Sequence, residues 1–372
     1  MVSSPLTVQA FLQAHLRALA KVAEVTVVAD SSDGRFLLPI SRALKFHRMP
    51  IRRAIEPLMD SLALLKLTVF FRKQKFDLVH SYTPKAGLLA MTAAFFAGVS
   101  QRIHTFTGQV WATKRGFFRH LLKNLDRLTA RMATHILVDS SSQMRFLRSE
   151  RVLPRGTGNI LGKGSVSGVD LKRFRPNPSV RKKLRRKMGL AKEAIVFLFV
   201  GRLKRDKGIP ELYEAFNAVR AQIPSAYLLL VGPKEENIPT PAKVIGAKNG
   251  VIYVGPSSKP ENYMAVADVL VLPSHREGFG TTVIEANACG IPVVASRIYG
   301  LKDAVVNGQT GILISRGKVT KLTKAMVKIG TNTKLRRRMG ITGLKRVKTN
   351  FDQNRITFSL LRFYKKKKIL MY

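Results

Sequence analysis

Two successive series of short apolar runs, separated by longer stretches with helical spacing, constrain the fold of this 372-residue chain most strongly. Apolar runs of about four to eight residues are typical of strands buried on both faces of a parallel sheet. The first series lies at 25–29, 78–81, 102–106 and 135–138, and the second starts near 195 and continues at 227–231, 251–254, 269–272 and 293–295. The sequence therefore predicts two doubly wound α/β domains.

Proline content and periodicity suggest the domain boundaries. Residues 170–178 contain two prolines and show no apolar period, which is typical of a linker. We expect an N-terminal Rossmann-like domain at 1–172, a linker at 173–180 and a second domain at 181–350. Residues 351–372 are expected to form an amphipathic helix with a basic tail.

The net charge is +43, from 65 basic and 22 acidic residues, and both halves of the chain share the excess. Such a field favours polyanions, so nucleic acid and an anionic membrane are both candidate partners. The chain contains no RNA-recognition signature, zinc-finger spacing or basic helix with a heptad tail. We therefore expect no specific nucleic-acid partner, although a protein that binds nucleic acid through charge alone remains an alternative.

Apolar and basic segments near the N-terminus bear on membrane contact. No apolar run approaches the ~20 residues needed to cross a bilayer, and no secretory signal is visible. A basic group precedes an apolar helix expected at 55–71, and its members are Arg42, Lys45, Arg48, Arg52 and Arg53. With Lys365–Lys368, this group suits peripheral contact with the inner face of the cell membrane from the cytoplasm. A solvated basic face over an ordinary core helix fits equally well.

The single cysteine, Cys289, excludes a disulfide framework and a cysteine zinc site. It stands in an apolar turn before a predicted strand, so we expect a buried structural thiol in a reducing compartment.

A pair of carboxylates flanks a glycine-rich turn after the predicted strand at 269–272. Glu277 precedes Gly278 and Gly280, which let the backbone turn sharply, and a helix is predicted from Thr281. The amides at a helix start attract anions, and Glu285 lies one turn into the helix. A ligand with phosphate in its middle and hydroxyls at both ends, such as a nucleotide sugar, suits this pattern.

A second turn, after the strand predicted near 195, carries cations. Gly201 is followed by Arg202 and then by Lys207 before a helical pattern begins. Arginine grips a diphosphate through two donors and lysine adds a point charge, whereas a solvated basic loop is the plainer interpretation.

These motifs resemble those of the family-four retaining glycosyltransferases with the GT-B fold. The resemblance rests on Gly201-Arg202 with Lys207-Gly208, on the Glu277–Glu285 pair and on residues 287–295. Segments 80–87, 103–114 and 164–170 resemble the branch that builds bacterial capsule, exopolysaccharide and O-antigen repeat units on a polyprenyl diphosphate. The resemblance implies two Rossmann-like domains facing across a cleft, with the last helix crossing back to the first domain. This fold has a full first strand where only Met1-Val2 precede Ser3 and Ser4, so we expect either a misassigned start codon or a truncated first strand.

The resemblance implies a hexosyltransferase with a nucleotide-sugar donor, a uridine diphosphate hexose or N-acetylhexosamine by family habit, and a lipid-linked saccharide acceptor. Glu277, Arg202 and Lys207 are the expected catalytic residues. The expected donor-binding residues are Gly201, Arg202, Lys207, Glu277, Gly278, Phe279, Gly280, Thr281 and Glu285. Those expected at the cleft and acceptor are Lys85, Thr107 and Gly108.

The chain has no Asp-x-Asp, so we expect no metal and no cofactor, with the cations stabilising the leaving diphosphate instead. His104 is expected to be structural, because strand alternation turns it away from Thr107. A nucleotide-sugar 2-epimerase shares the fold and remains an alternative, but it needs an acid–base cluster around the sugar that the sequence does not show.

Overall fold

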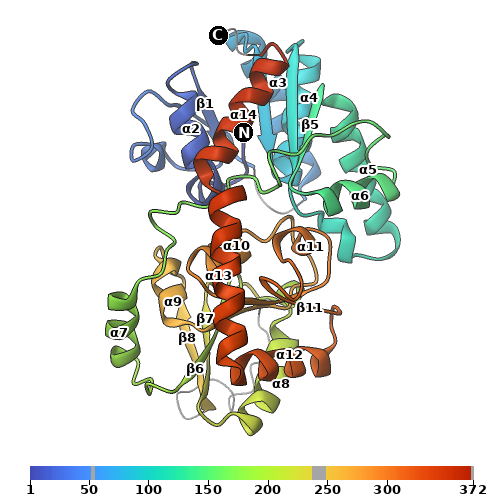
Figure 1. Cartoon of the computed structure of the whole chain (residues 1–372). Helices are drawn as coiled ribbons and strands as arrows, with labels where there is room; N and C mark the ends of the chain where they lie inside the picture. Colours follow the sequence, from blue (N-terminus) through green and yellow to red (C-terminus); the bar gives the residue numbers. More distant parts are fainter. Residues whose placement is uncertain (52–54, 237–248, 370–372) are drawn as a thin grey trace. The chain divides into compact units, whose positions relative to one another are not determined.

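The computed structural model describes residues 1–51, 55–236 and 249–369, and the chain divides into two compact units (Figure 1). Unit 1 comprises Met1–Gly168 with Gln353–Tyr372, and unit 2 comprises Val169–Asp352. The segment expected as a linker, 173–180, therefore lies inside unit 2, where helix α7 (Pro178–Lys187) begins. The two prolines and the lack of an apolar period belong to the irregular first segment of unit 2, which begins at Val169.

Unit 2 is built on one parallel sheet of six strands in the order β11-β10-β9-β6-β7-β8. Their apolar sequences leave almost every side chain buried, as expected for a sheet covered on both faces. The strands are β6 (Ile195–Val200), β7 (Ala226–Val231), β8 (Val251–Gly255), β9 (Val269–Leu272), β10 (Val293–Ser296) and β11 (Gly311–Ile314).

Helices cover this sheet and bury their apolar sides in one core. Phe216 of α8 lies fully buried beside Phe197 of β6, with 6.4 Å between the ring centroids. Burying a phenylalanine stabilises the fold by about 1.5–3 kcal/mol. Besides α7, the helices are α8 (Ile209–Gln222), α9 (Pro260–Val266), α10 (Thr281–Ala288), α11 (Leu301–Ala304), α12 (Val319–Thr331) and α13 (Thr333–Asn350).

Unit 1 contains two separate parallel sheets. One pairs β1 (Thr26–Ala29) with β2 (Lys45–Arg48), and the other has the order β3-β4-β5. The strands of the second sheet are β3 (Leu78–Tyr82), β4 (Gln101–Phe106) and β5 (His135–Val138). Met1 and Val2 bridge the two sheets, because the Val2 N–H donates to the Val28 carbonyl and the Tyr82 N–H donates to the Met1 carbonyl, each at 3.0 Å. Two residues thus occupy the place where a truncated first strand was expected.

The helices of unit 1 surround these sheets, and the last one comes from the far end of the chain. Ile356, Leu360 and Tyr364 of α14 (Gln353–Lys366) pack against Ile103 and Leu137 of the β3–β5 sheet. The other helices are α1 (Pro5–Thr7), α2 (Gln13–Leu19), α3 (Pro57–Gln74), α4 (Pro84–Phe96), α5 (Gly116–Met132) and α6 (Ser141–Ser149).

Buried polar bonds tie α14 to the rest of unit 1. The Thr357 hydroxyl lies 2.8 Å from Nδ1 of His15, and the Tyr364 hydroxyl bonds Nδ1 of His80. Burial lowers the pKa of both histidines, so each is held as neutral imidazole. Leu361 and Phe363 of the same helix are only half-buried.

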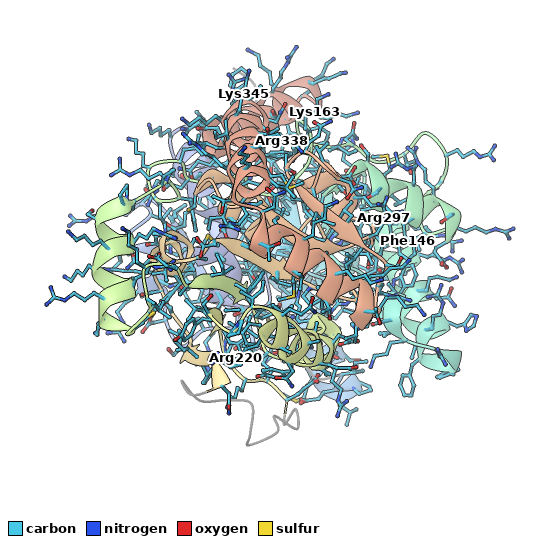
Figure 2. All side chains as sticks on the ribbon, turned by 60° about the horizontal axis from the view of Figure 1, so that its bottom comes forward. Phe146, Lys163, Arg220, Arg297, Arg338 and Lys345 are labelled. Carbon is cyan, nitrogen blue, oxygen red and sulfur yellow. The ribbon has the colours of Figure 1, made fainter. Side chains whose placement is uncertain are left out.

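Basic side chains cover both units. Figure 2 shows nitrogen-tipped side chains projecting from α7, at the left of the view, and around the labelled Arg338 and Lys345 of α13. The positive field is therefore distributed over the surface and is not confined to one tail. In the described part of the chain no helix is both long enough and apolar enough to span a bilayer.

Candidate active site

The turn between β6 and α8 presents the predicted cations. Gly201 ends the strand, and Lys207 closes a short 3-10 turn whose last residue leads into Gly208, at φ 72°. A Cβ at Gly208 would overlap the carbonyl oxygen of Pro273, so only glycine lets this turn pack against the end of β9. Arg202 donates to Glu235 at 2.8 Å.

The loop after β9 brings Glu277 to the same place. Oε1 of Glu277 accepts from Nζ of Lys207 at 2.6 Å and from the Ser274 hydroxyl at 2.8 Å. The side chains of Lys207 and Glu277 are about 15% and 14% exposed, so their attraction is only partly screened by water. Two residues 70 positions apart in the sequence therefore form one charged pair.

Further links fix this loop against the β6–α8 turn. The His275 N–H donates to the Asp206 carbonyl at 2.9 Å, and Arg276 donates to the Asp206 carboxylate at 3.0 Å. The imidazole of His275 lies 2.7 Å from Glu211 of α8. These contacts set the position of Glu277 before any ligand arrives, which is the preorganisation that catalysis requires.

The glycine-rich turn leads from Glu277 into α10. Gly280 has φ 82° and Thr281 is the first residue of the helix, so the free amides of α10 face the same loop. A Cβ at Gly300 would overlap the carbonyl oxygen of Gly278, so only glycine at position 300 allows this close approach to the turn. The side chain of Phe279 is 3% exposed and packs against Phe351. Phe279 was expected among the donor-binding residues, but its ring is part of the core and only its backbone faces the turn.

Glu285 stands one turn into α10 in a different electrostatic setting. Burial raises its pKa to about 7, while the charge of Arg173 opposes this shift. Arg173 itself donates to Glu261 at 2.9 Å. A carboxyl group with a pKa near neutrality both accepts and donates hydrogen bonds, which suits a ligand with adjacent hydroxyls.

The predicted residues of unit 1 follow the carboxyl ends of its strands. Lys85, after β3, lies 2.6 Å from Asp60 of α3. Thr107 and Gly108 follow β4, and the Thr107 carbonyl accepts from the side chains of Gln109 and Gln143. In open α/β sheets ligands bind at this edge.

His104 is structural, as predicted. It is 2% exposed, Nδ1 lies 2.9 Å from the Ser81 hydroxyl, and its ring fills the space beside Gly87.

Sequence reasoning missed three residues of the site. Ser274 orients Glu277, Glu235 engages Arg202, and Gly300 supports the turn. Ser274 stood next to the carboxylate motif, but nothing in the sequence placed Glu235 or Gly300 near it. Within the described residues no group of three or more His, Cys, Asp or Glu side chains is arranged to hold a metal ion.

Comparison with known families gives two matches that together cover most of the chain. Residues 180–346 match the glycosyl transferases group 1 family, and residues 8–158 match a glycosyl transferase 4-like domain. The capsular polysaccharide biosynthesis glycosyltransferase CapM of Staphylococcus aureus is 31% identical over 90% of this chain and 88% of its own length.

Two further proteins are similar. An Escherichia coli UDP-Gal:alpha-D-GlcNAc-diphosphoundecaprenol alpha-1,3-galactosyltransferase is 27% identical over 74% of this chain and 72% of its own. The crystal structure of HepE from Anabaena, in complex with UDP and glucose, superposes with a TM-score of 0.79 at 20% identity over 98% of both chains. The last likeness shows the GT-B fold. On this evidence the chain belongs to the group 1 glycosyltransferase family and is a hexosyltransferase of polysaccharide biosynthesis.

Proposed function

We propose that this enzyme transfers a hexose or N-acetylhexosamine from a uridine diphosphate sugar, with retention of the anomeric configuration, to a saccharide carried on a polyprenyl diphosphate. The observation that carries the proposal is the Lys207–Glu277–Ser274 arrangement at the start of α10. It combines a cation, an oriented carboxylate and helix amides, which are the groups that a sugar next to a diphosphate needs. The printed names of the relatives, one a galactosyltransferase that uses a lipid-linked acceptor, support it.

Breaking the bond from the anomeric carbon to the diphosphate builds negative charge on the leaving phosphate. Lys207, Arg202 and the amides of α10 stabilise that charge without a metal. In the free protein Lys207 is neutralised by Glu277. A bound diphosphate competes for Lys207 and frees Glu277 to accept from hydroxyls of the donor sugar, while Ser274 keeps the carboxylate oriented. Donor binding and the placement of Glu277 are therefore coupled.

Glu285 takes the other end of the donor. Its raised pKa leaves part of the population protonated near neutrality, and either form hydrogen-bonds a ribose hydroxyl. Because desolvation is the main cause of the shift, hydroxyl donors that satisfy the carboxylate will lower its pKa again. Donor binding at pH 7 is then expected to release a fraction of a proton.

Unit 1 provides the acceptor side in this proposal. Lys85 lies where a diphosphate would meet a cation, and its link to Asp60 is the kind of pair that an incoming phosphate replaces. Thr107 and Gly108 follow the neighbouring strand at the same edge of the sheet.

An acceptor held in a bilayer requires the enzyme to reach a membrane, and the surface of unit 1 supports such contact. Large apolar side chains of the first turns of α3 and α5 stand in solvent, with Leu58 83%, Phe117 75% and Phe118 62% exposed. Lys114 and Arg115 immediately precede α5, so cations flank the apolar group. We propose an anionic lipid surface as the partner, because apolar side chains next to cations suit a headgroup boundary. Arg52 and Arg53, which were expected to contribute, lie outside the described residues.

Turnover of a panel of nucleotide sugars by the purified enzyme tests the proposal. We expect one uridine diphosphate sugar to be hydrolysed slowly and to be transferred when a polyprenyl diphosphate saccharide is added. The product anomer, measured by NMR, should match that of the donor. Activity should persist in excess EDTA. An inverted product would refute the retaining mechanism, and interconversion of the donor sugar without transfer would refute the transferase.

A further inference from the structure

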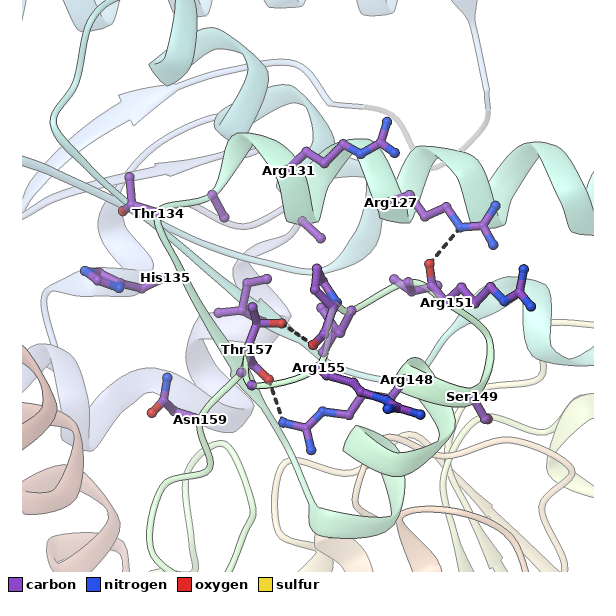
Figure 3. Close-up of a pocket in the computed structure, with 18 of the residues that line it drawn as sticks. Arg127, Arg131, Thr134, His135, Arg148, Ser149, Arg151, Arg155, Thr157 and Asn159 are labelled. Atoms are coloured by element: carbon purple, nitrogen blue, oxygen red, sulfur yellow. Dashed lines mark hydrogen bonds between the residues drawn. The ribbon is translucent and has the colours of Figure 1, made fainter.

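Unit 1 contains a cavity that none of these roles uses. It has a volume of about 920 Å³ and lies between the second half of α5, the end of α6 and the loop at residues 150–159 (Figure 3). Thr134, His135 and Ile136 line it from the amino end of β5. Lys85 and Thr107 follow the carboxyl ends of neighbouring parallel strands, so this cavity lies at the opposite edge of the sheet.

The lining is strongly cationic. None of the described residues that line the cavity carries a carboxylate. The nearby Glu150 is engaged elsewhere, because it accepts from Arg119 at 2.6 Å and from Lys123 at 3.0 Å. The basic side chains of the lining are Arg127, Arg131, Arg148, Arg151, Arg155 and Lys367.

Two of these arginines build the walls. Nε of Arg127 donates to the carbonyl of Arg151 at 2.9 Å, and Arg148 donates to the carbonyl of Thr157 at 2.8 Å, as the dashed lines in Figure 3 show. Both bonds fix the loop, and no ion pair with a carboxylate of the described residues compensates the charges of these two guanidinium groups. The arrangement is therefore a shaped cationic concavity and not only a basic stretch of surface.

The backbone of Arg151 adds an independent observation. Its φ is 54°, and it follows the end of α6 at the position where helices ordinarily place glycine or asparagine. A residue with a Cβ costs about 1–2 kcal/mol in this conformation. An exposed arginine kept at a strained position beside a cationic cavity points to a role for its guanidinium.

The base of the cavity is apolar, uncharged polar atoms complete its lining, and its volume indicates the size of the ligand. Val152 and Leu153 form a buried apolar base, and Asn159 and His135 offer uncharged polar atoms. Burial and the charge of Lys367 both lower the pKa of His135, in keeping with a positive potential. A cavity of this volume accommodates a ligand of nucleotide size.

We propose that this cavity binds a small compound carrying two or more linked phosphates, with Arg131, Arg151 and Arg155 contacting the phosphate oxygens. Guanidinium groups bind such oxygens through paired donors, and the polyanion supplies the charge that the lining lacks. The site stands independently of the transferase mechanism, because it shares no residue with the donor or acceptor positions.

Calorimetric titration of the whole enzyme with inorganic triphosphate tests the site, at physiological salt and with UDP present to occupy unit 2. The test variant combines Arg131→Ser, Arg151→Gly and Arg155→Ser. The matched control removes three exposed cations outside the cavity by Lys21→Ser, Lys73→Ser and Arg145→Ser. We expect one site, at least tenfold weaker affinity in the test variant and less than a twofold change in the control. Arg151→Gly alone should weaken binding without lowering the unfolding temperature, because glycine relieves the strained backbone.

Equal affinity in all three proteins, or equal losses in the test and control variants, would overturn the proposal. A parallel titration with a nucleoside triphosphate separates two sources of the same chemistry. Tighter binding than inorganic triphosphate assigns a nucleoside polyphosphate, and equal binding assigns the phosphate chain alone. If a short random oligonucleotide binds the cavity and triphosphate does not, the small-molecule assignment is wrong.

Discussion

Unit 2 encloses one continuous apolar core around six strands, whereas unit 1 holds four smaller apolar clusters around two separate sheets. Among the described residues, all but one of the large apolar side chains that stand exposed belong to unit 1, and the exception is Ile341 of α13. Unit 1 also buries Asp126, Asp139 and His104. The difference separates two tasks. Under the proposed function, unit 2 meets a soluble donor and is closed against water, whereas unit 1 meets a lipid-linked acceptor and keeps apolar surface available.

The strongest test compares one phenylalanine from each unit. Phe216→Ala removes a fully buried ring from the core of unit 2 and should lower the free energy of unfolding by about 3–5 kcal/mol. Phe118→Ala removes a ring that is 62% exposed and should change it by less than about 0.5 kcal/mol. Urea titrations of both variants measure the two values. Similar losses would mean that the exposed rings of unit 1 are buried in solution and that the comparison fails.

The second test assigns donor chemistry to unit 2. Lys207→Met removes the partner of Glu277 and one donor to the leaving phosphate, so kcat/KM should fall by about 10²–10³. Lys192→Met, at an exposed position of the same unit, is the control and should be unchanged. Steady-state kinetics with the identified donor give both values. Undiminished turnover in the Lys207 variant would remove this residue from the site, whereas vesicle binding should be the same in both variants.

The third test addresses the exposed apolar surface of unit 1. Changing Phe117 and Phe118 together to Ser should weaken sedimentation with anionic vesicles by about tenfold, because the rings no longer enter the headgroup boundary. Phe95→Ser with Phe96→Ser, at the carboxyl end of α4, is the matched control. Binding by the wild type should fall with added salt. Equal sedimentation with neutral vesicles, or equal losses in both variants, would contradict the assigned surface.

The last test concerns pH. Burial raises the pKa of Asp139 to about 8, so the native protein holds a proton that the unfolded chain releases above about pH 4. The contribution of Asp139 to the free energy of unfolding therefore falls as the pH rises from about 4 to 8. Burial lowers the pKa of His104 to about 3, and its contribution is lost as the pH falls from about 6.5.

Asp139→Asn should accordingly raise the unfolding temperature more at pH 8.5 than at pH 5. The difference in the free energy of unfolding between the variant and the wild type should grow by on the order of 1 kcal/mol per pH unit across this window. Thermal unfolding at several pH values measures it. A constant difference between the variant and the wild type would show that Asp139 does not titrate with folding.

Much of this fold follows from local pattern, as two strands illustrate. The predicted runs at 135–138 and 269–272 match β5 and β9, because both strands are short, apolar and bounded by polar residues. β2 (Lys45–Arg48) was missed, since a lysine and an arginine stand at its ends and both are exposed. β11 (Gly311–Ile314) was missed because a three-residue apolar run after a glycine gives no period.

The candidate site was predictable as two motifs but not as one contact. The sequence alone does not show that Lys207 and Glu277 share a hydrogen bond. The two residues are brought together by the pairing of β6 with β9. Phe279 illustrates the reverse limit. The resemblance implied a donor-binding role for it but could not show that its ring packs on Phe351.

The return of α14 to unit 1 sets the order in which the chain acquires its structure during synthesis. Unit 1 is discontinuous, and unit 2 is inserted between its two parts. The ribosome makes about 185 residues of unit 2 before the residues that cover Ile103 and Leu137 emerge. Until then the nascent first part exposes an apolar face and leaves His80 without the Tyr364 hydroxyl. Unit 2 can therefore complete its fold first, and the earlier segment waits for the last helix.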